Sequence, residues 1–203
     1  MPEINKDTEA KIKEAAKRIF VQKGFDGARV RDIAEEAGVN IALMNYYFRS
    51  KEQLFEQIYT EVFTGFFNRI LSILNEETPF EVKIWQLVDK YIDFLLENAM
   101  VPSFVLSELT RNDGQIFKKF NVSGVIQNAY FTKQLKDEIE KGNYRDIEPL
   151  QLIMTILGSM VFPFIAKPVV RYIGDLDEKG FQAFVMERKK IIPVMIMTYL
   201  RTK

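Results

Sequence analysis

The chain contains no cysteine and no histidine among its 203 residues. Without cysteine there can be no disulfide, no thiol nucleophile and no thiolate metal ligand. Without histidine there is no imidazole, the group that most acid–base sites near neutral pH use. No spacing typical of a metal or cofactor site occurs. We therefore expect a binding protein and not an enzyme, with an all-α enzyme or carrier as a disfavoured alternative.

The chain also lacks an excess of charge of either sign, since 28 basic residues balance 28 acidic ones. Through Lys51 the count is ten basic residues against eight acidic ones, a weak excess. Bulk charge therefore gives no argument for a nucleic-acid partner. Any DNA affinity must come from the placement of a few groups and from the pairing of two copies.

Long hydrophobic runs are missing as well. The longest apolar stretch, Leu152 to Ala166, is shorter than a membrane span and contains Pro163, so we expect a buried helix there. The first residues are polar and charged, which predicts no signal peptide. We expect a cytoplasmic protein with no membrane partner.

Apolar residues recur at helical spacing almost throughout, and no strand pattern occurs. The sequence predicts an all-α fold of about nine helices. Pro163 and Pro193 fall within predicted helices, where each should kink or end the helix. The predicted ranges are 8–24, 30–37, 41–47, 50–74, 80–98, 103–110, a helix broken near 121–124 that runs to 141, 147–165 and 178–202.

The stretch from Val30 to Lys51 carries the strongest functional signal. Gly38 stops one short helix, and Asn40 is a good N-cap for the next. This outline is that of a helix-turn-helix, which lays its second helix in the DNA major groove. The spacing predicts that Val39, Met44 and Phe48 face inward.

The opposite face of the second helix is predicted to be exposed, and it comprises Ile41, Ala42, Leu43, Asn45, Tyr46 and Tyr47. Asn45 could read adenine, and the tyrosines could hold phosphates or pack on sugars. Lys51 follows in the first turn of a helix capped by Ser50, where its ammonium and free N–H groups meet an anion. Taken singly, two tyrosines and a lysine are more often packing and solvated groups. Their combination with the glycine turn favours a DNA-binding role.

These residues resemble the DNA-binding domain of the tetracycline-repressor (TetR) family of bacterial transcriptional regulators. The resemblance covers about Thr8 to Glu56, a quarter of the chain, and rests on three runs: Phe20-x3-Gly24-Phe25-Asp26-Gly27, Val30-x2-Ile33-Ala34-x2-Ala37-Gly38-Val39 and Tyr47-Phe48-x-Ser50-Lys51-Glu52-x-Leu54. It implies that Ala42, Leu43, Tyr46 and Tyr47 lie at the groove and that Lys51, Arg29 and Arg31 contact phosphates. Ile41 and Asn45 depart from the usual residues, so the face that would read DNA is more apolar than is typical.

The resemblance implies a DNA-binding domain over residues 1–52 and a helical ligand-binding and dimerisation domain over residues 53–203. Members are usually homodimers joined by their last two long helices. Two apolar stripes suit such an interface, and their candidate residues are Leu157, Met160, Val161, Phe164, Ile192, Met195 and Ile196. The alternative is that these side chains form the core of a single chain.

The resemblance further implies a small-molecule pocket in the second domain. The candidates for a hydrophobic or aromatic ligand are Phe66, Trp85, Tyr91, Phe104, Ser107 and Phe131, although packing is the more common role for each. We expect a ligand-responsive repressor that binds a palindrome in double-stranded DNA as a homodimer. The alternative is a DNA-binding protein of the same fold that has no small effector and acts through a protein partner or architecturally.

Overall fold

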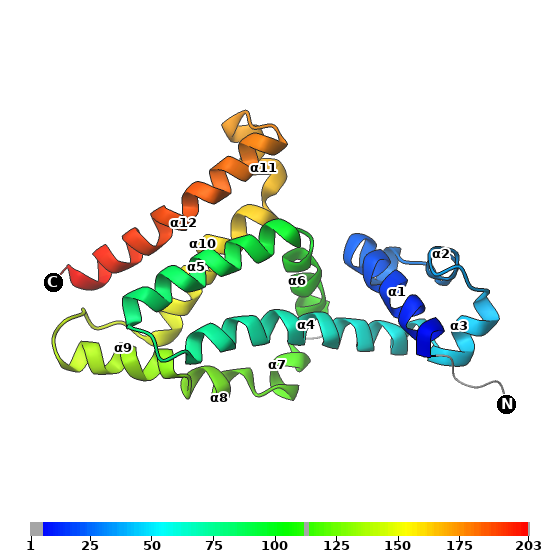
Figure 1. Ribbon diagram of the computed structural model, residues 1–203, viewed down its shortest axis with the longest axis horizontal. Helices are drawn as coiled ribbons and strands as arrows, with labels where there is room; N and C mark the ends of the chain where they lie inside the picture. Colours follow the sequence, from blue (N-terminus) through cyan, green and yellow to red (C-terminus); the bar gives the residue numbers. More distant parts are fainter. Residues whose placement is uncertain (1–5, 112–113, 203) are drawn as a thin grey trace. The chain divides into compact units, whose positions relative to one another are not determined.

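The computed structural model describes residues 6–111 and 114–202, which form α-helices and no β-strand (Figure 1). The predicted all-α fold is thus confirmed. The helices are α1 (Lys6–Gly27), α2 (Val30–Glu36), α3 (Ile41–Phe48), α4 (Lys51–Asn75), α5 (Phe80–Glu97), α6 (Val101–Arg111), α7 (Gln115–Lys119), α8 (Val122–Gln127), α9 (Tyr130–Glu140), α10 (Pro149–Ile165), α11 (Lys167–Gly174) and α12 (Glu178–Arg201).

Residues 6–111 and 114–202 form twelve helices, where we predicted about nine for the chain. The segment predicted as one broken helix forms three, α7 to α9, because Asn121 is left-handed (φ 46°) and Ala129 is extended. A further helix, α11, was not predicted; it begins at Lys167 and has a proline in its first turn.

We predicted that two prolines would kink or end their helices. Pro163 lies inside α10, two residues before the helix ends at Ile165, and Pro193 lies inside α12, which continues to Arg201. Both are buried in the structure. Packing against neighbouring helices therefore compensates for the hydrogen bond that each proline cannot donate.

The predicted stop of the first helix is confirmed at Gly24. Its backbone has φ 68° and ψ −177°, which interrupts α1 before a last turn at residues 25–27. A positive φ of this kind strains any residue with a Cβ, so glycine suits the position. The break places Phe25 at the start of that short turn.

Contacts divide the chain into two compact units. The first comprises residues 1–66 and 103–116, and the second comprises residues 67–102 and 117–203. The first unit therefore includes most of α6 in addition to the N-terminal helices. The boundary that we predicted after residue 52 separates a DNA-binding domain from a ligand-binding and dimerisation domain. This division by function stays a prediction.

Aromatic side chains hold the first unit together around Phe55 of α4. Its ring packs edge-on against Phe20 of α1 and Phe104 of α6, with centroids 4.9 and 5.8 Å away. Tyr59, one turn further along α4, donates its hydroxyl to the carbonyl of Val105 at 3.2 Å, and burial raises the pKa of this tyrosine. Each such ring pair adds about 0.5–1.5 kcal/mol beyond the area that it buries.

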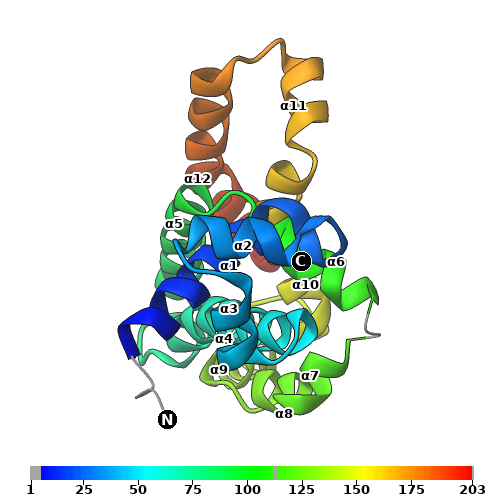
Figure 2. The same ribbon diagram turned by 90° about the vertical axis from the view of Figure 1, so that its right-hand side faces the viewer.

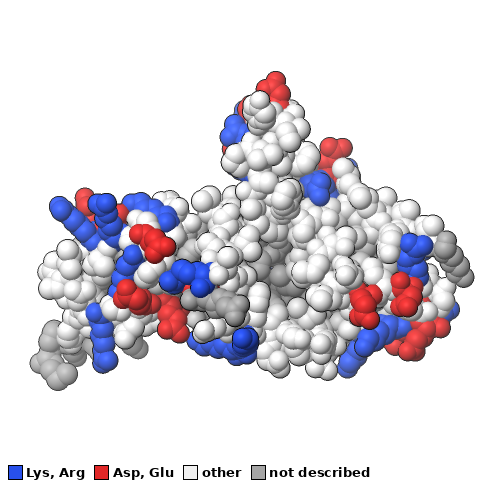
Figure 3. All heavy atoms as spheres, turned by 180° about the vertical axis from the view of Figure 1, so that it is seen from behind, with Lys and Arg blue, Asp and Glu red and all other residues white. Residues whose placement is uncertain are grey.

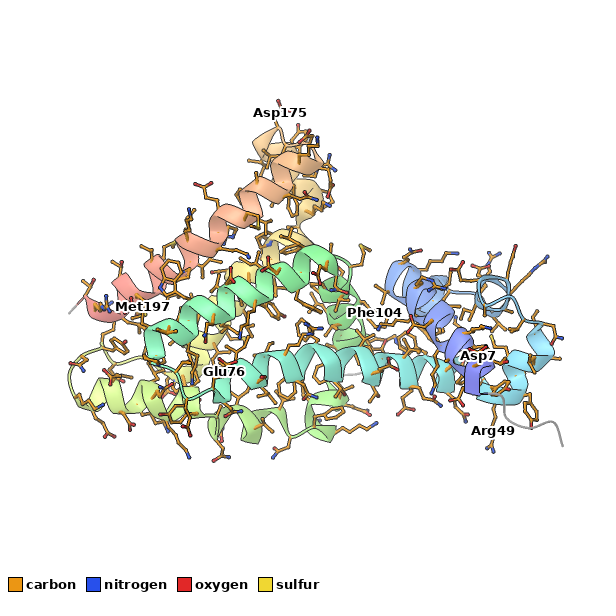
Figure 4. The ribbon with its side chains drawn as sticks, viewed as in Figure 1. Asp7, Arg49, Glu76, Phe104, Asp175 and Met197 are labelled. Atoms are coloured by element: carbon orange, nitrogen blue, oxygen red, sulfur yellow. The ribbon has the colours of Figure 1, made fainter. Side chains whose placement is uncertain are left out.

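The second unit is built around α5, which contacts α9, α10 and α12. Figure 2 shows α11 and the first turns of α12 as two limbs that project from this unit. Asp175, at the tip between them, is left-handed (φ 49°) and is labelled in Figure 4. No single helix in the described part of the chain is long and apolar enough to cross a membrane. α10 and α11 pass that test only as a pair, and they are bent by 77°.

Candidate DNA-binding site

The turn between α2 and α3 has the geometry of a helix-turn-helix. Ile33 and Ala34 of α2 are buried, and the N–H of Val39 donates to the carbonyl of Ala34 at 2.9 Å. Gly38 has φ 67°, the left-handed conformation that ends the hydrogen-bonded turn. The chain therefore reverses within a few residues, so that α3 packs on α2.

The α3 helix begins at the predicted cap. The N–H of Leu43 donates to the side-chain oxygen of Asn40 at 2.7 Å. Met44 and Phe48, four residues apart, are buried as predicted, while Val39 is half-buried. The inner face of α3 is thus anchored in the first unit.

The predicted outer face of α3 is largely open. Ile41 and Tyr46 are 44% and 49% exposed, and Ala42 and Asn45 are also exposed. Leu43 and Tyr47 are half-buried, at the edge of this face. The rings of Tyr46 and Tyr47 meet edge-to-face with centroids 5.5 Å apart. The result is a small apolar platform with one amide, Asn45, beside it.

Lys51 stands at the start of α4, directly after the cap. The N–H of Gln53 donates to the Ser50 hydroxyl at 3.2 Å, which confirms the predicted N-cap. The ammonium of Lys51 lies 4.2 Å from the centre of the Phe25 ring, a cation–π contact. The remaining N–H groups of the first turn and this ammonium together favour an anion.

The structure separates the basic residues of the first unit into paired and unpaired ones. Lys23 pairs with Asp32 at 2.7 Å, and Arg18 pairs with Glu36 at 2.9 Å. The Lys23 hydrogen bond lowers the pKa of the Asp32 carboxyl. These pairs join α1 to α2, so Lys23 and Arg18 already have carboxylate partners within the protein.

Arg29 and Arg31, both exposed, form no ion pair with any carboxylate that the structure describes. The same holds for Arg49, which caps the end of α3 with φ 59° and is labelled in Figure 4. The sequence analysis missed Arg49, although its place between α3 and Lys51 was a usable signal. On the face drawn in Figure 3, basic and acidic side chains lie interspersed over the first unit, in keeping with the near-neutral count.

The six predicted ligand residues are divided between the two units. Phe66, Phe104 and Ser107 belong to the first, and Trp85, Tyr91 and Phe131 to the second. Tyr91, Phe104 and Phe131 are buried, Phe66 is half-buried, and Trp85 and Ser107 are exposed. Phe131 stacks on Phe80 with ring centres 4.9 Å apart, which is a packing contact.

One hollow in the second unit lies between α4 and α5 and has a volume of about 360 Å³. The guanidinium of Arg69 lies 5.0 Å from the Phe94 ring centre, and the ammonium of Lys90 lies 3.3 Å from a Glu76 oxygen. Of the predicted ligand residues, Tyr91 alone is part of its lining. The lining residues are Asn68, Arg69, Ser72, Ile73, Glu76, Lys90, Tyr91 and Phe94.

The predicted dimer residues differ in their exposure within one chain. Met160, Phe164, Ile192 and Ile196 are buried, Leu157 and Val161 are half-buried, and Met195 is 65% exposed. The four buried side chains pack inside the second unit, so they have little surface left for a partner.

Apart from Met195, the apolar side chains that stay exposed on α10 and α12 were not among the predicted dimer residues. Among these exposed side chains is a set that comprises Leu150, Met154, Phe162, Val194, Met195 and Tyr199. Figure 3 shows a broad area without charged side chains over the second unit. Among residues 6–111 and 114–202, no cluster of three or more carboxylates could hold a metal ion.

Comparison with known proteins agrees with this geometry. Residues 12–58 match the family model of the bacterial regulatory proteins, tetR family. The chain is 28% identical over 162 residues to "Probable HTH-type transcriptional regulator YttP" of Bacillus subtilis, covering 78% of this chain and 77% of that one. It is 25% identical over 158 residues to the HTH-type transcriptional repressor AcnR of Corynebacterium glutamicum, covering 77% and 79%.

A solved structure extends the likeness to nearly the whole fold. It is that of the transcriptional regulator FadR from Bacillus subtilis in complex with stearoyl-CoA. The TM-score is 0.64 at 16% identity, over 95% of this chain and 99% of that one. Its N-terminal helices match the TetR family model, and in its sequence relatives and its fold the chain is similar to TetR-family transcriptional regulators.

Proposed function

We propose that the chain is a transcriptional repressor that binds a palindromic operator as a homodimer and leaves it when a small effector binds. The observation that carries this proposal is the exposed face of α3, held between a capped start and the Lys51 turn. In the first unit, Arg29, Arg31, Arg49 and Lys51 form no ion pair with a carboxylate that the structure describes, and they suit the phosphates on either side of a groove.

The side chains of α3 have different roles in this proposal. Asn45 is exposed and carries the amide that pairs well with adenine. Ala42 is small and lets the helix approach the base edges. Ile41, Tyr46 and the half-buried Tyr47 offer apolar contacts to sugars and thymine methyl groups. Lys51 holds the backbone, so it contributes affinity and not sequence preference.

The homodimer rests on the exposed apolar set of α10 and α12. Side chains as open as Leu150 (62%) and Phe162 (64%) form a patch that a monomer rarely leaves in water. A symmetric pair buries this patch twice and sets two α3 helices on successive half-sites of a palindrome. Dimerisation also compensates for the weak net charge of each DNA-binding unit.

The effector class follows from the hollow between α4 and α5. Its volume lies in the usual range for ligand sites, about 300–1,000 Å³. Ile73 and Phe94 supply apolar surface, and Arg69 forms no ion pair with a carboxylate in the described ranges. We therefore propose an effector with an apolar body and an anionic group. The stearoyl-CoA bound to the FadR neighbour combines the same two properties.

Such an effector acts by shifting a population. If it binds more tightly to a conformation whose two α3 helices no longer match the operator, it reduces DNA affinity by that difference. This effect of the effector is reversible and needs no covalent step.

The decisive experiment selects bound sequences from random double-stranded DNA and repeats the selection with stearoyl-CoA, free fatty acids and aromatic acids present. We expect a palindromic consensus and release by one of these anionic classes. Failure to enrich any sequence would overturn the repressor proposal. Enrichment that no candidate changes would favour the alternative without a small effector.

A further inference from the structure

Arg111, at the end of α6, is fixed by a buried carboxylate in the first unit. Its guanidinium donates two hydrogen bonds to Glu108, at 2.8 and 2.7 Å. Glu108 is only 4% exposed, and this bidentate pairing compensates for removing its carboxylate from water. The hydrogen bonds to Glu108 raise the pKa of Arg111. The arginine is thus held in one place on α6.

The held guanidinium lies over the same aromatic ring as Lys51. Arg111 is 4.5 Å from the centre of the Phe25 ring, and the Lys51 ammonium is 4.2 Å from that centre. Arg111 also lies 5.5 Å from the Phe55 ring, which packs edge-on against Phe25 at 4.9 Å. Phe25 is therefore in contact with two cations and with the aromatic core that includes Phe104, labelled in Figure 4.

Phe25 needs such support because of its position. It follows the break at Gly24 and belongs to a single turn, residues 25–27, which that break separates from the rest of α1. A long lysine side chain is otherwise free to sample many rotamers, and ordering it costs free energy. A fixed ring lowers this cost by offering the ammonium one preferred place before DNA arrives.

We propose that Arg111 and Glu108 are positioning residues for DNA binding, which act by holding the Phe25 ring on which the Lys51 ammonium is oriented toward a phosphate. This inference rests on the proposed role of Lys51. It adds the end of α6 to the DNA-binding apparatus, although Arg111 itself touches no base or phosphate. Glu108 acts one step further back, through Arg111.

A double-mutant cycle on the full-length chain tests the proposal. The variants are Arg111→Ala, Lys51→Ala and the pair, each titrated onto the selected operator at several salt concentrations. We expect Lys51→Ala to weaken binding about tenfold or more and to lower the salt slope by about two, one lost phosphate contact in each subunit. Arg111→Ala should weaken binding about threefold to tenfold and lower the slope in the same direction.

If Arg111 acts by positioning Lys51, the effects of the two alanine substitutions on operator affinity should not be additive. When Lys51 is already alanine, Arg111→Ala should change the affinity less than about twofold. Losses that multiply in the pair, or an Arg111→Ala loss with an unchanged salt slope, would overturn the proposal. Arg111→Lys keeps a cation near the ring but not the bidentate bond, so it should lie between wild type and alanine.

Arg188→Ala is the matched control. Arg188 also contacts a ring, that of Phe184 at 5.7 Å, and donates twice to the carbonyl of Ser159, but it belongs to the second unit. It should cost stability without changing the coupling to Lys51. Thermal unfolding of every variant identifies any that fails to fold.

A measurement on the protein without DNA tests the positioning role independently of the repressor function. The ring current of Phe25 should shift the NMR signals of the Lys51 ε-methylene, and Phe25→Leu should abolish this shift. We expect Arg111→Ala to reduce it strongly as well. An unchanged shift in Arg111→Ala would refute the positioning role even if DNA binding is intact, whereas a chain that binds no DNA but shows the reduced shift would refute only the repressor function.

Discussion

The side chains of α3 differ in whether they can contribute affinity or sequence preference. Asn45 is the exposed amide of the helix, while Tyr47 is a half-buried ring 6.3 Å from Phe48. An amide that pairs with one base edge affects one position of the operator. A phosphate anchor, the role that we propose for Lys51, affects every sequence equally.

We therefore expect Asn45→Ala to relax discrimination at one base pair in each half-site. The loss against the preferred base should be about 1–3 kcal/mol, with little change on sequences already mismatched there. Titration against operators substituted at each position measures it.

By contrast, Tyr47→Ala and Lys51→Ala should weaken binding to all of these operators by a similar factor. Uniform weakening by Asn45→Ala, with discrimination kept at every position, would show that Asn45 does not read a base.

At the scale of the element, capping decides where α3 begins. The side chain of Asn40 accepts the N–H of Leu43 and so caps the start of this helix. Asn40→Ala should lower the free energy of unfolding by about 1 kcal/mol. Urea denaturation followed by circular dichroism measures this loss.

Asn40→Asp separates the cap from the contact with DNA. A carboxylate caps the helix as well as an amide does, so stability should be retained. The added negative charge near the phosphates should still weaken DNA binding, most strongly at low salt. Equal loss of stability in both variants would contradict the capping role.

The end of α4 is held by an unusual group, the fully buried Lys83 of α5. Its ammonium donates to the carbonyl of Leu74 at 3.1 Å and lies 4.5 Å from the Tyr130 ring centre. Burial lowers the pKa of Lys83, against a smaller opposing effect of Glu76. The unfolded chain therefore binds a proton more readily than the folded chain does.

The sign of the pH dependence follows from this. As the pH rises toward the ordinary lysine pKa of 10.5, the cost of burying the charge falls. The stability of the wild type relative to Lys83→Met should then increase with pH, because methionine fills similar volume without a charge. Denaturant titrations of both proteins across this range test it, and a constant difference would contradict it.

Much of the site was predictable from the sequence because its determinants are local. The spacing of Met44 and Phe48, the Asn40 cap and the Gly38 turn all act within a few residues. The faces of α10 were not predictable, because both Met154 and Met160 lie in an apolar helix and periodicity alone does not say which side meets the core. The contact of Arg111 with Phe25 was also hidden, since it joins residues far apart in the chain.

At the scale of the whole molecule, the proposed function requires two copies. Met195→Asp places a charge where 65% of a methionine is exposed on α12. We expect this variant to remain folded but to dissociate to monomers, and its affinity for a full palindrome should fall to that for a half-site. Sedimentation and operator titration measure the two effects.

Tyr172→Asp provides the matched control. Tyr172, on α11, is 89% exposed and lies outside the set of α10 and α12 residues on which the homodimer rests. If Tyr172→Asp dissociated the protein and Met195→Asp did not, the interface would include the projecting limbs instead.

The projecting limbs and the absence of cysteine together make the assembly accessible to spectroscopy. Lys179 is exposed in the first turn of α12, close to the tip, and a cysteine introduced there would be the chain's only thiol. A single spin label per subunit would then give one inter-label distance in a symmetric pair. Changes in that distance on adding DNA or an acyl-CoA would report the motion of the second units in solution, with no background label to subtract.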